Sequence, residues 1–204
     1  MKTIAFIFVS LFICAQSSAQ EQTLISGPIE NGGYGGPVVK FTRVSDRFAV
    51  LVGGYGGWLI NHTFMIGGGG YGLANSIHAS RTAQTYYGTG DNLRTQFGYG
   101  GLVLEYIGIP DNLIHYSVSA LIGAGGVNYN YLYDMYLPSF ENTEHASPCF
   151  VLEPSAGVEL NVTPFFRMNA GVGYRLVRGT DLPGITDADL SDLSGYLTFK
   201  FGKF

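Results

Sequence analysis

The sequence has few of the features that usually stabilise an exported chain or anchor it in a membrane. It has two cysteines among 204 residues, and one of them, Cys14, lies in an N-terminal segment that we expect to be removed. Cys149 alone cannot form an intramolecular disulfide, so an exported domain must gain its stability elsewhere. Beyond residue 19, no unbroken apolar run reaches the ~18 residues that a spanning helix needs. These absences exclude a disulfide framework and a helical membrane protein.

Charge is also scarce. Charged residues make up 13% of the chain, with 11 basic and 15 acidic side chains and a formal net charge of -4. No basic patch is present, so nucleic acid is not an expected partner. No grouping of His, Cys and Asp has the spacing of a metal site, and we expect neither a metal nor a cofactor.

The N-terminus has the features of a secretory signal peptide. One early positive charge precedes an apolar run over residues 4–15, and small residues occupy positions 17 and 19. This order of charge, apolar run and small residues predicts cleavage after Ala19. The chain is therefore expected to be exported.

The rest of the sequence is dominated by strict alternation of apolar and polar residues. Phe150–Val162 and Phe166–Val177 each alternate over more than ten residues, which is the period of a strand with one apolar and one polar face. Similar segments predict eight strands in all. They cover residues 37–44, 48–60, 64–75, 96–107, 113–128, 150–162, 166–177 and 193–204.

The connections between these strands favour a barrel over a sandwich. From the second turn onward they are alternately short and long, which is typical of a transmembrane meander with short periplasmic turns and longer external loops. A Greek-key sandwich would not give this regularity. We therefore predict an all-β, eight-stranded, antiparallel up-and-down transmembrane barrel. The expected parts are a signal peptide (1–19), an N-terminal periplasmic segment (20–36) and the barrel (37–204).

Glycine and tyrosine recur together in clusters such as Gly53-Gly54-Tyr55-Gly56-Gly57. A phosphate-binding loop would need a following helix, and usually a Lys-Ser/Thr pair, and the clusters have neither. Glycine lets a small barrel bend sharply, and a tyrosine on the adjacent strand can cover the bare backbone. We expect these glycines to be structural.

The last strand ends in Phe204, after Phe201-Gly202-Lys203. With the signal peptide and eight strands, the chain resembles the small OmpA/OmpX-type barrels, and its Gly/Tyr-rich strands resemble the outer-membrane barrel-domain proteins of Bacteroidota-type bacteria. The resemblance implies a Gram-negative outer membrane, with lipid and the barrel assembly machinery as partners, and Phe204 as an assembly signal. Phe204 shares its parity with Lys200 rather than Phe201, so a lipid-facing Phe204 requires a bulge near Gly202.

Charged side chains occupy the polar face of the predicted strands. An eight-stranded barrel has an interior only wide enough for side chains, so charges confined there must pair. We expect Glu153 to lie opposite Arg175 and Glu159 to lie near Arg167, as a structural plug; a proton or ion path is the alternative. The predicted lumen network comprises Lys40, Glu105, His115, Glu153, Glu159, Arg167, Arg175 and Lys200.

Aromatic residues at the strand ends suggest membrane girdles. We assign Trp58 to the girdle at the short-turn side, and a tyrosine cluster to the other girdle or to packing of the external loop. That cluster comprises Tyr129, Tyr131, Tyr133 and Tyr136. Tyrosine-rich loops can also be recognition surfaces, so the long loops 76–95 and 129–147 could bind an extracellular ligand or surface partner.

One pattern hints at catalysis. His78 and Ser80 resemble the His-x-Ser pair of outer-membrane lipid A deacylases, with Asp91 as a possible acid. The residues after Ser80 do not match that family. The sequence therefore favours a non-enzymatic barrel with a structural, adhesive or surface-interaction role. A lipid-modifying hydrolase and a secreted soluble β-sandwich binder are the alternatives.

Overall fold

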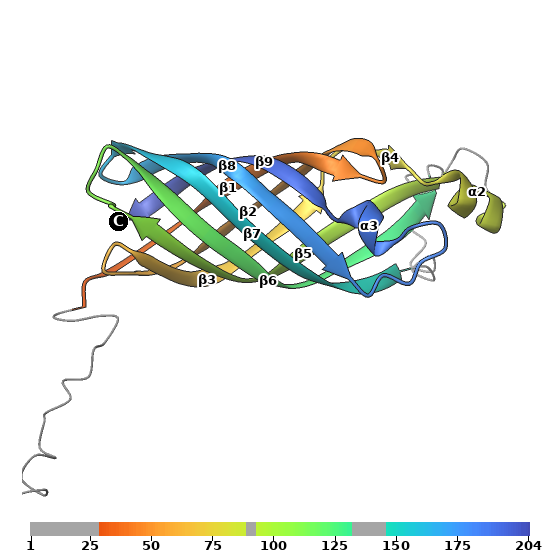
Figure 1. The fold of residues 1–204 in the computed structure, drawn as a ribbon, viewed down its shortest axis with the longest axis horizontal. Helices are drawn as coiled ribbons and strands as arrows, with labels where there is room; N and C mark the ends of the chain where they lie inside the picture. Colours follow the sequence, from red (N-terminus) through yellow and green to blue (C-terminus); the bar gives the residue numbers. More distant parts are fainter. Residues whose placement is uncertain (1–28, 89–92, 132–145) are drawn as a thin grey trace, which may run out of the picture.

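The computed structural model describes residues 29–88, 93–131 and 146–204. They form one closed antiparallel β-barrel with two short helices at one end (Figure 1). The elements are β1 (Asn31–Val44), β2 (Arg47–Ile60), β3 (Phe64–Leu73), β4 (Ile77–His78), α2 (Arg81–Tyr87), β5 (Leu93–Gly108), β6 (Ile114–Tyr131), β7 (Ala146–Thr163), β8 (Phe166–Arg178), α3 (Asp187–Leu190) and β9 (Asp192–Lys203).

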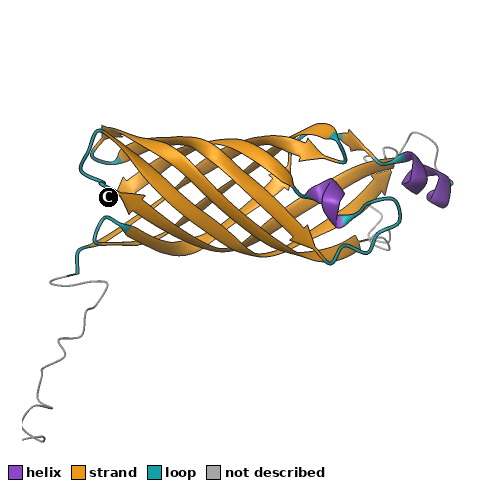
Figure 2. Ribbon diagram, in the orientation of Figure 1, coloured by secondary structure: helices purple, strands orange, loops and turns teal. Residues whose placement is uncertain are grey.

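Eight long strands run up and down, each paired with its neighbour in the chain, and β9 closes the barrel by pairing with β1. The two-residue β4 pairs with the start of β5, where β3 has already ended. The predicted fold class is therefore confirmed. Figure 2 shows the turns β2–β3, β5–β6 and β7–β8 and the C-terminus at one end of the barrel, and both helices with the short β1–β2 turn at the other. Following the usual arrangement of such barrels, these are called the periplasmic and outer ends.

The first strand corrects a predicted boundary. β1 begins at Asn31, not at residue 37, so residues 31–36 belong to the barrel and not to a periplasmic segment. This stretch is mostly glycine, which hides the apolar alternation, yet it pairs in register with β2 through Gly35 and Gly56. The predicted signal peptide lies outside the described residues.

Two hairpins close through turns with consecutive positive φ angles. Ser45 and Asp46 have φ angles of 51° and 58°, and Asn61 and His62 have φ angles of 49° and 56°. Consecutive positive φ values define the type I′ turn, whose twist matches that of the paired strands. The predicted short turns at both places are confirmed, including the short first external hairpin.

The outer surface of the barrel is a broad apolar belt. Neither described helix is long and apolar enough to cross a membrane, whereas a belt around a closed sheet is suited to lipid. Aromatic rings meet near both of its edges, with ring centroids 6.4 Å apart for Phe41 and Phe48 and 4.8 Å apart for Phe166 and Phe201. Exposed members include Phe41, Val52, Trp58, Ile66, Leu102, Leu104, Tyr106, Tyr116, Val118, Ile122, Phe150, Val158, Val172, Tyr174 and Phe201.

Inside the barrel, tyrosines pack against glycines of neighbouring strands, as the clusters predict. A Cβ built on each of these glycines would lie 2.6–2.8 Å from a side-chain atom of its tyrosine, which is closer than real side chains approach. The bare backbone thus makes room for the tyrosine. The pairs are Tyr34 with Gly202, Tyr55 with Gly69, Tyr71 with Gly53 and Tyr99 with Gly125.

Replacing one such glycine should cost stability. In Gly69→Ala the new methyl group would collide with Tyr55, so we expect the free energy of unfolding to fall by ~1–3 kcal/mol. Gly72→Ala in the same strand meets nothing within 4 Å and is the matched control. Denaturant unfolding in lipid vesicles measures both; equal stabilities would contradict the tight packing.

Candidate functional site in the barrel lumen

The periplasmic half of the lumen is centred on Lys200 of β9. Its ammonium group donates to Glu105 Oε1 of β5 at 2.5 Å and to Glu159 Oε2 of β7, and all three side chains are buried. One cation thus bridges two carboxylates on strands that are not neighbours. The contact spans the barrel interior rather than a single hairpin.

Further donors surround Glu159. Arg167 Nη1 donates to its Oε1 at 3.2 Å, and His115 Nε2 lies 3.3 Å from the same oxygen. Asn169 Nδ2 donates to the other oxygen at 3.2 Å and to Ser117 Oγ at 2.6 Å. A carboxylate buried in this way keeps its charge because donors and cations replace the water it has lost.

Tyrosine hydroxyls satisfy the second carboxylate. Tyr34 and Tyr55 both donate to Glu105 Oε2, at 2.7 and 2.9 Å. Both tyrosines pack against glycines of the neighbouring strand, and both hydroxyls reach the same lumenal carboxylate. The Gly/Tyr clusters therefore supply hydrogen bonds to the charge network as well as bending the sheet.

A second ion pair lies nearer the outer end. Lys40 Nζ of β1 is 2.6 Å from Glu153 Oε2 of β7 and 3.4 Å from the ring centroid of Tyr71. Tyr99 donates to the same carboxylate oxygen at 2.9 Å. A cavity of about 30 Å³ beside this pair is lined by hydroxyls of Ser119, Ser155 and Thr198, among others. It is large enough for about one or two water molecules.

All eight predicted lumen residues are buried inside the barrel. The expected contact between Glu159 and Arg167 is present. The expected pair of Glu153 with Arg175 is wrong. The pairing of β7 with β8 puts these two residues level, but Glu153 binds Lys40 across the lumen instead.

Arg175 has a different environment from the other three lumen cations. Its Nε donates to the Leu190 carbonyl at 2.6 Å and its Nη2 to the Arg43 carbonyl at 3.1 Å. Among the described residues, no carboxylate lies within 4.0 Å of the guanidinium, and Nη1 has no hydrogen-bond partner. The centre of the guanidinium is 5.2 Å from the ring centroid of Phe97.

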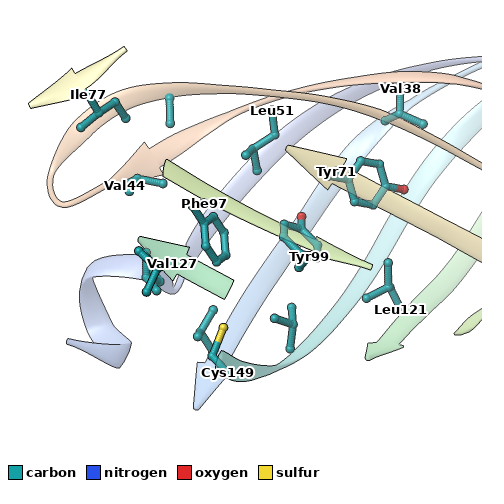
Figure 3. Close-up of a cluster of buried hydrophobic side chains, with 14 of the residues drawn as sticks. Val38, Val44, Leu51, Tyr71, Ile77, Phe97, Tyr99, Leu121, Val127 and Cys149 are labelled. Atoms are coloured by element: carbon teal, nitrogen blue, oxygen red, sulfur yellow. The ribbon is translucent and has the colours of Figure 1, made fainter. Parts of the chain in front are cut away.

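Above Arg175 the lumen becomes apolar. Figure 3 shows Phe97, Val127 and Cys149 pointing into a shared cluster at the outer end of the barrel. Leu182, Ile185 and Leu190 of the connection between β8 and β9 join this cluster from above. The lumen therefore has two ion-pair layers below and an apolar layer on top.

The structure places the predicted aromatic girdle residues in different environments. Trp58 is 49% exposed on the outer surface next to a short turn, as a girdle residue should be. Tyr129 is not a girdle residue: it is buried, and its hydroxyl donates to the Pro183 carbonyl at 3.0 Å. It has the inward parity of its strand. Tyr133, Tyr136 and the side chain of Tyr131 lie outside the described residues.

The suggested His78–Ser80 pair is not formed in the described part of the chain. Ser80 Oγ donates to the Gly184 carbonyl at 2.5 Å and accepts the Ala83 N–H, which caps α2. Asp91 lies outside the described residues. Within the described ranges, no three His, Cys, Asp or Glu side chains are grouped to hold a metal ion.

The C-terminal residue also departs from expectation. The pairing of β9 with β1 and β8 runs without a register shift, so there is no bulge near Gly202. Phe204 stacks on the lumenal Tyr34 at 5.3 Å between ring centroids, and the Arg167 guanidinium lies 4.0 Å from its centroid. Phe204 therefore packs at the periplasmic mouth, and its role as an assembly signal stays a prediction.

Removing the bridging cation should strongly destabilise the barrel. Lys200→Met leaves Glu105 and Glu159 buried with one cation fewer, and we expect a loss of ~3–5 kcal/mol in the free energy of unfolding. Lys203→Met, exposed on the same strand, is the control and should change little. Adding Glu159→Gln to Lys200→Met should recover part of the loss. Indistinguishable unfolding curves for the two lysine variants would contradict the bridging role.

No protein-family model matches this chain, and no curated protein matches it. Solved structures do match its fold. Neisserial surface protein A matches with a TM-score of 0.57 at 13% identity, covering 87% of this chain and 100% of its own. The N-terminal barrel of Pseudomonas aeruginosa OprF matches with a TM-score of 0.50 at 14% identity, covering 86% and 99%.

A third structure is the Yersinia pestis attachment invasion locus protein Ail, solved in complex with the heparin analogue sucrose octasulfate. It matches with a TM-score of 0.50 at 13% identity, covering 87% of this chain and 100% of its own. At these identities the likeness concerns the fold. The chain therefore has the fold of the small eight-stranded outer-membrane β-barrels, the OmpA/OmpX type that its sequence resembles.

Proposed function

We propose that the protein spans a Gram-negative outer membrane as a closed barrel and acts there as a structural or surface-interaction element rather than as a pore. The apolar belt and its aromatic edges support the location. The observation that carries closure is the pair of ion layers: Lys200 bridges Glu105 and Glu159, and Lys40 binds Glu153 across the lumen. An ion moving through the barrel would have to separate these pairs.

Separation of these pairs is costly in the barrel interior. A buried charge that loses its partner costs several kcal/mol, because no water replaces the lost contact. The tyrosine hydroxyls on Glu105 and Glu153 hold the carboxylates in place. At the outer end, the contact made by Ser80 weakens the hydrolase alternative, because the Ser80 hydroxyl already donates to the Gly184 carbonyl.

Conductance measurements test closure directly. The purified protein, first shown to be folded by a heat-dependent shift in gel mobility, should give no steady ion current in a planar bilayer. A large folded porin is the positive control. A stable ohmic conductance would refute the closed lumen, and a protein that stays in the aqueous fraction without a gel shift would refute the membrane barrel.

The placement of the arginines favours an anionic surface partner. All five arginines outside the lumen lie at the outer end, and Ail, which shares the fold, was solved with a sulfated ligand. Asp192 pairs with Arg43 at 2.8 Å, and no carboxylate of the described residues lies within 4.0 Å of the other four guanidinium groups. The five are Arg43, Arg47, Arg81, Arg94 and Arg178.

Binding to a sulfated polysaccharide tests the surface role. We expect bilayer-embedded protein to bind heparin at low salt and to release it as salt rises, since exposed charge contacts are screened. Combining Arg47→Gln, Arg81→Gln and Arg94→Gln should weaken binding, whereas Lys203→Gln at the periplasmic end should not. Equal binding by the triple variant and the control would remove this candidate function.

A further inference from the structure

The connection between β8 and β9 folds across the outer mouth of the barrel. Residues 179–191 leave the end of β8, form a turn bridged between Leu182 and Ile185, and return through α3 to β9 (Figure 1). Leu182, Ile185 and Leu190 are 6%, 5% and 0% exposed, because they insert into the apolar top of the lumen. The segment thus contributes to the interior rather than projecting from it.

Hydrogen bonds tie this segment to elements around the rim. The Pro183 and Gly184 carbonyls accept from Tyr129 of β6 and from Ser80 ahead of α2. The Asp181 N–H donates to Ser147 of β7 at 2.7 Å, and the Asp189 carbonyl accepts from the Ser45 N–H in the first hairpin at 2.8 Å. The segment is therefore held from several sides of the mouth, chiefly by single hydrogen bonds.

The segment also has its own internal closure. The Asp187 carboxylate accepts the N–H groups of Thr180 and Gly179, and these hydrogen bonds hold the pKa of the Asp187 carboxyl below its usual range. Gly179 and Gly184 have φ angles of 91° and 85°, a region that suits glycine, and they give the segment its two sharp bends. It can thus keep its shape while its contacts to the rim change.

Arg175 links the segment to the barrel wall from below. It is fully buried, and its two bound donors reach the Leu190 carbonyl in α3 and the Arg43 carbonyl in β1. With no carboxylate in reach among the described residues, these carbonyls and the Phe97 ring replace its hydration. Moving α3 away would remove a main partner of a buried charge, which is costly.

We propose that residues 179–191 form a lid that closes the outer mouth, and that Arg175 is the positioning residue that holds it shut. The lid is a second closure, separate from the two ion-pair layers deeper in the lumen. It deepens the proposed closed-lumen function and rests on it. Opening the lid would expose the apolar top of the lumen to the outside while the ion pairs below remain intact.

The chain carries a natural reporter beneath the lid. Cys149 faces inward on β7, is 6% exposed, and lies two residues below Ser147, which contacts the lid (Figure 3). We expect a polar thiol reagent added from outside to reach Cys149 faster when the lid opens. The rate at which the reagent modifies Cys149 therefore measures lid opening without any ion current.

The experiment compares Cys149 modification in folded, bilayer-embedded protein, with the modified site identified by mass spectrometry. Arg175→Met should raise the rate about tenfold or more, since a charge-assisted hydrogen bond to the lid is lost. Lys203→Met, an exposed cation at the periplasmic end, should match the wild-type rate. Lys40→Met, which breaks the upper ion pair, should also leave the rate within about twofold, because it does not touch the lid.

Each outcome bears on the lid. A folded Arg175→Met protein that reacts at the wild-type rate would overturn the role of Arg175. If that variant does not fold, Tyr129→Phe with Ser80→Ala removes two lid contacts and should accelerate modification; no acceleration would overturn the lid. Faster Cys149 modification in Lys40→Met would show that the lid and the upper ion pair do not close the lumen separately, and would overturn the lid as a second closure. An ion current through the wild-type protein would refute closure of the lumen, the lid included, whereas fast Cys149 modification of the wild type without a current would overturn the lid and leave the ion-pair closure standing.

Discussion

The space inside an eight-stranded barrel is too narrow for water-filled passage and too wide to stay empty, so side chains must fill it. This protein fills the lower part with charge. Once Lys200 enters the lumen, carboxylates must meet it, and Glu105 and Glu159 do so from β5 and β7. Hydroxyls and amides then satisfy the remaining carboxylate oxygens, because a buried charged oxygen left unpaired costs more than a hydrogen bond typically contributes.

The glycine clusters follow from the same constraint. Tyr55, which donates to Glu105, has its Cβ where a side chain at position 69 would collide with it, and the bare backbone at Gly69 leaves that space free. Glycine costs a strand backbone entropy and packing. Here that cost is offset by the hydrogen bond and the ring contact that the missing side chain allows. The sheet, the rings and the charges are therefore one interdependent arrangement.

The residues that face the lumen were largely predictable from the sequence, because side chains still alternate between the two faces of the sheet when it closes into a barrel. Inward parity placed all eight lumen residues correctly, and Arg167 meets Glu159 because their strands are hairpin neighbours. Parity also predicts the inward positions of Tyr129 and Phe204. Tyr129 has the same parity as the lumenal His115, and Phe204 has the same parity as the lumenal Lys200. Tyr129 was assigned by residue type to a girdle or to packing of the external loop, and a lipid-facing Phe204 required a bulge; Tyr129 is buried and Phe204 stacks on Tyr34.

Contacts across the lumen could not be predicted. Lys40 and Glu153 are far apart in sequence, and their meeting depends on how the strands are staggered when β9 closes onto β1. Local patterns carry no information on that stagger, since it is a property of the whole closed sheet. For the same reason, the contacts of the β8–β9 connection could not be predicted, because its side chains contact residues from several strands that meet only at the rim of the closed barrel.

In the closed barrel that we propose, the two ends of the lumen are held by interactions of different kinds. In the periplasmic half, each charge contacts several partners, so moving any one group would leave another buried charge without a partner. At the outer mouth, the connection is held by hydrogen bonds worth ~0.5–1.5 kcal/mol each and by three aliphatic side chains. Segments of that kind open locally at free energies well below global unfolding. Motion should therefore concentrate at the outer end, while the ion-pair layers keep the barrel rigid and closed beneath it.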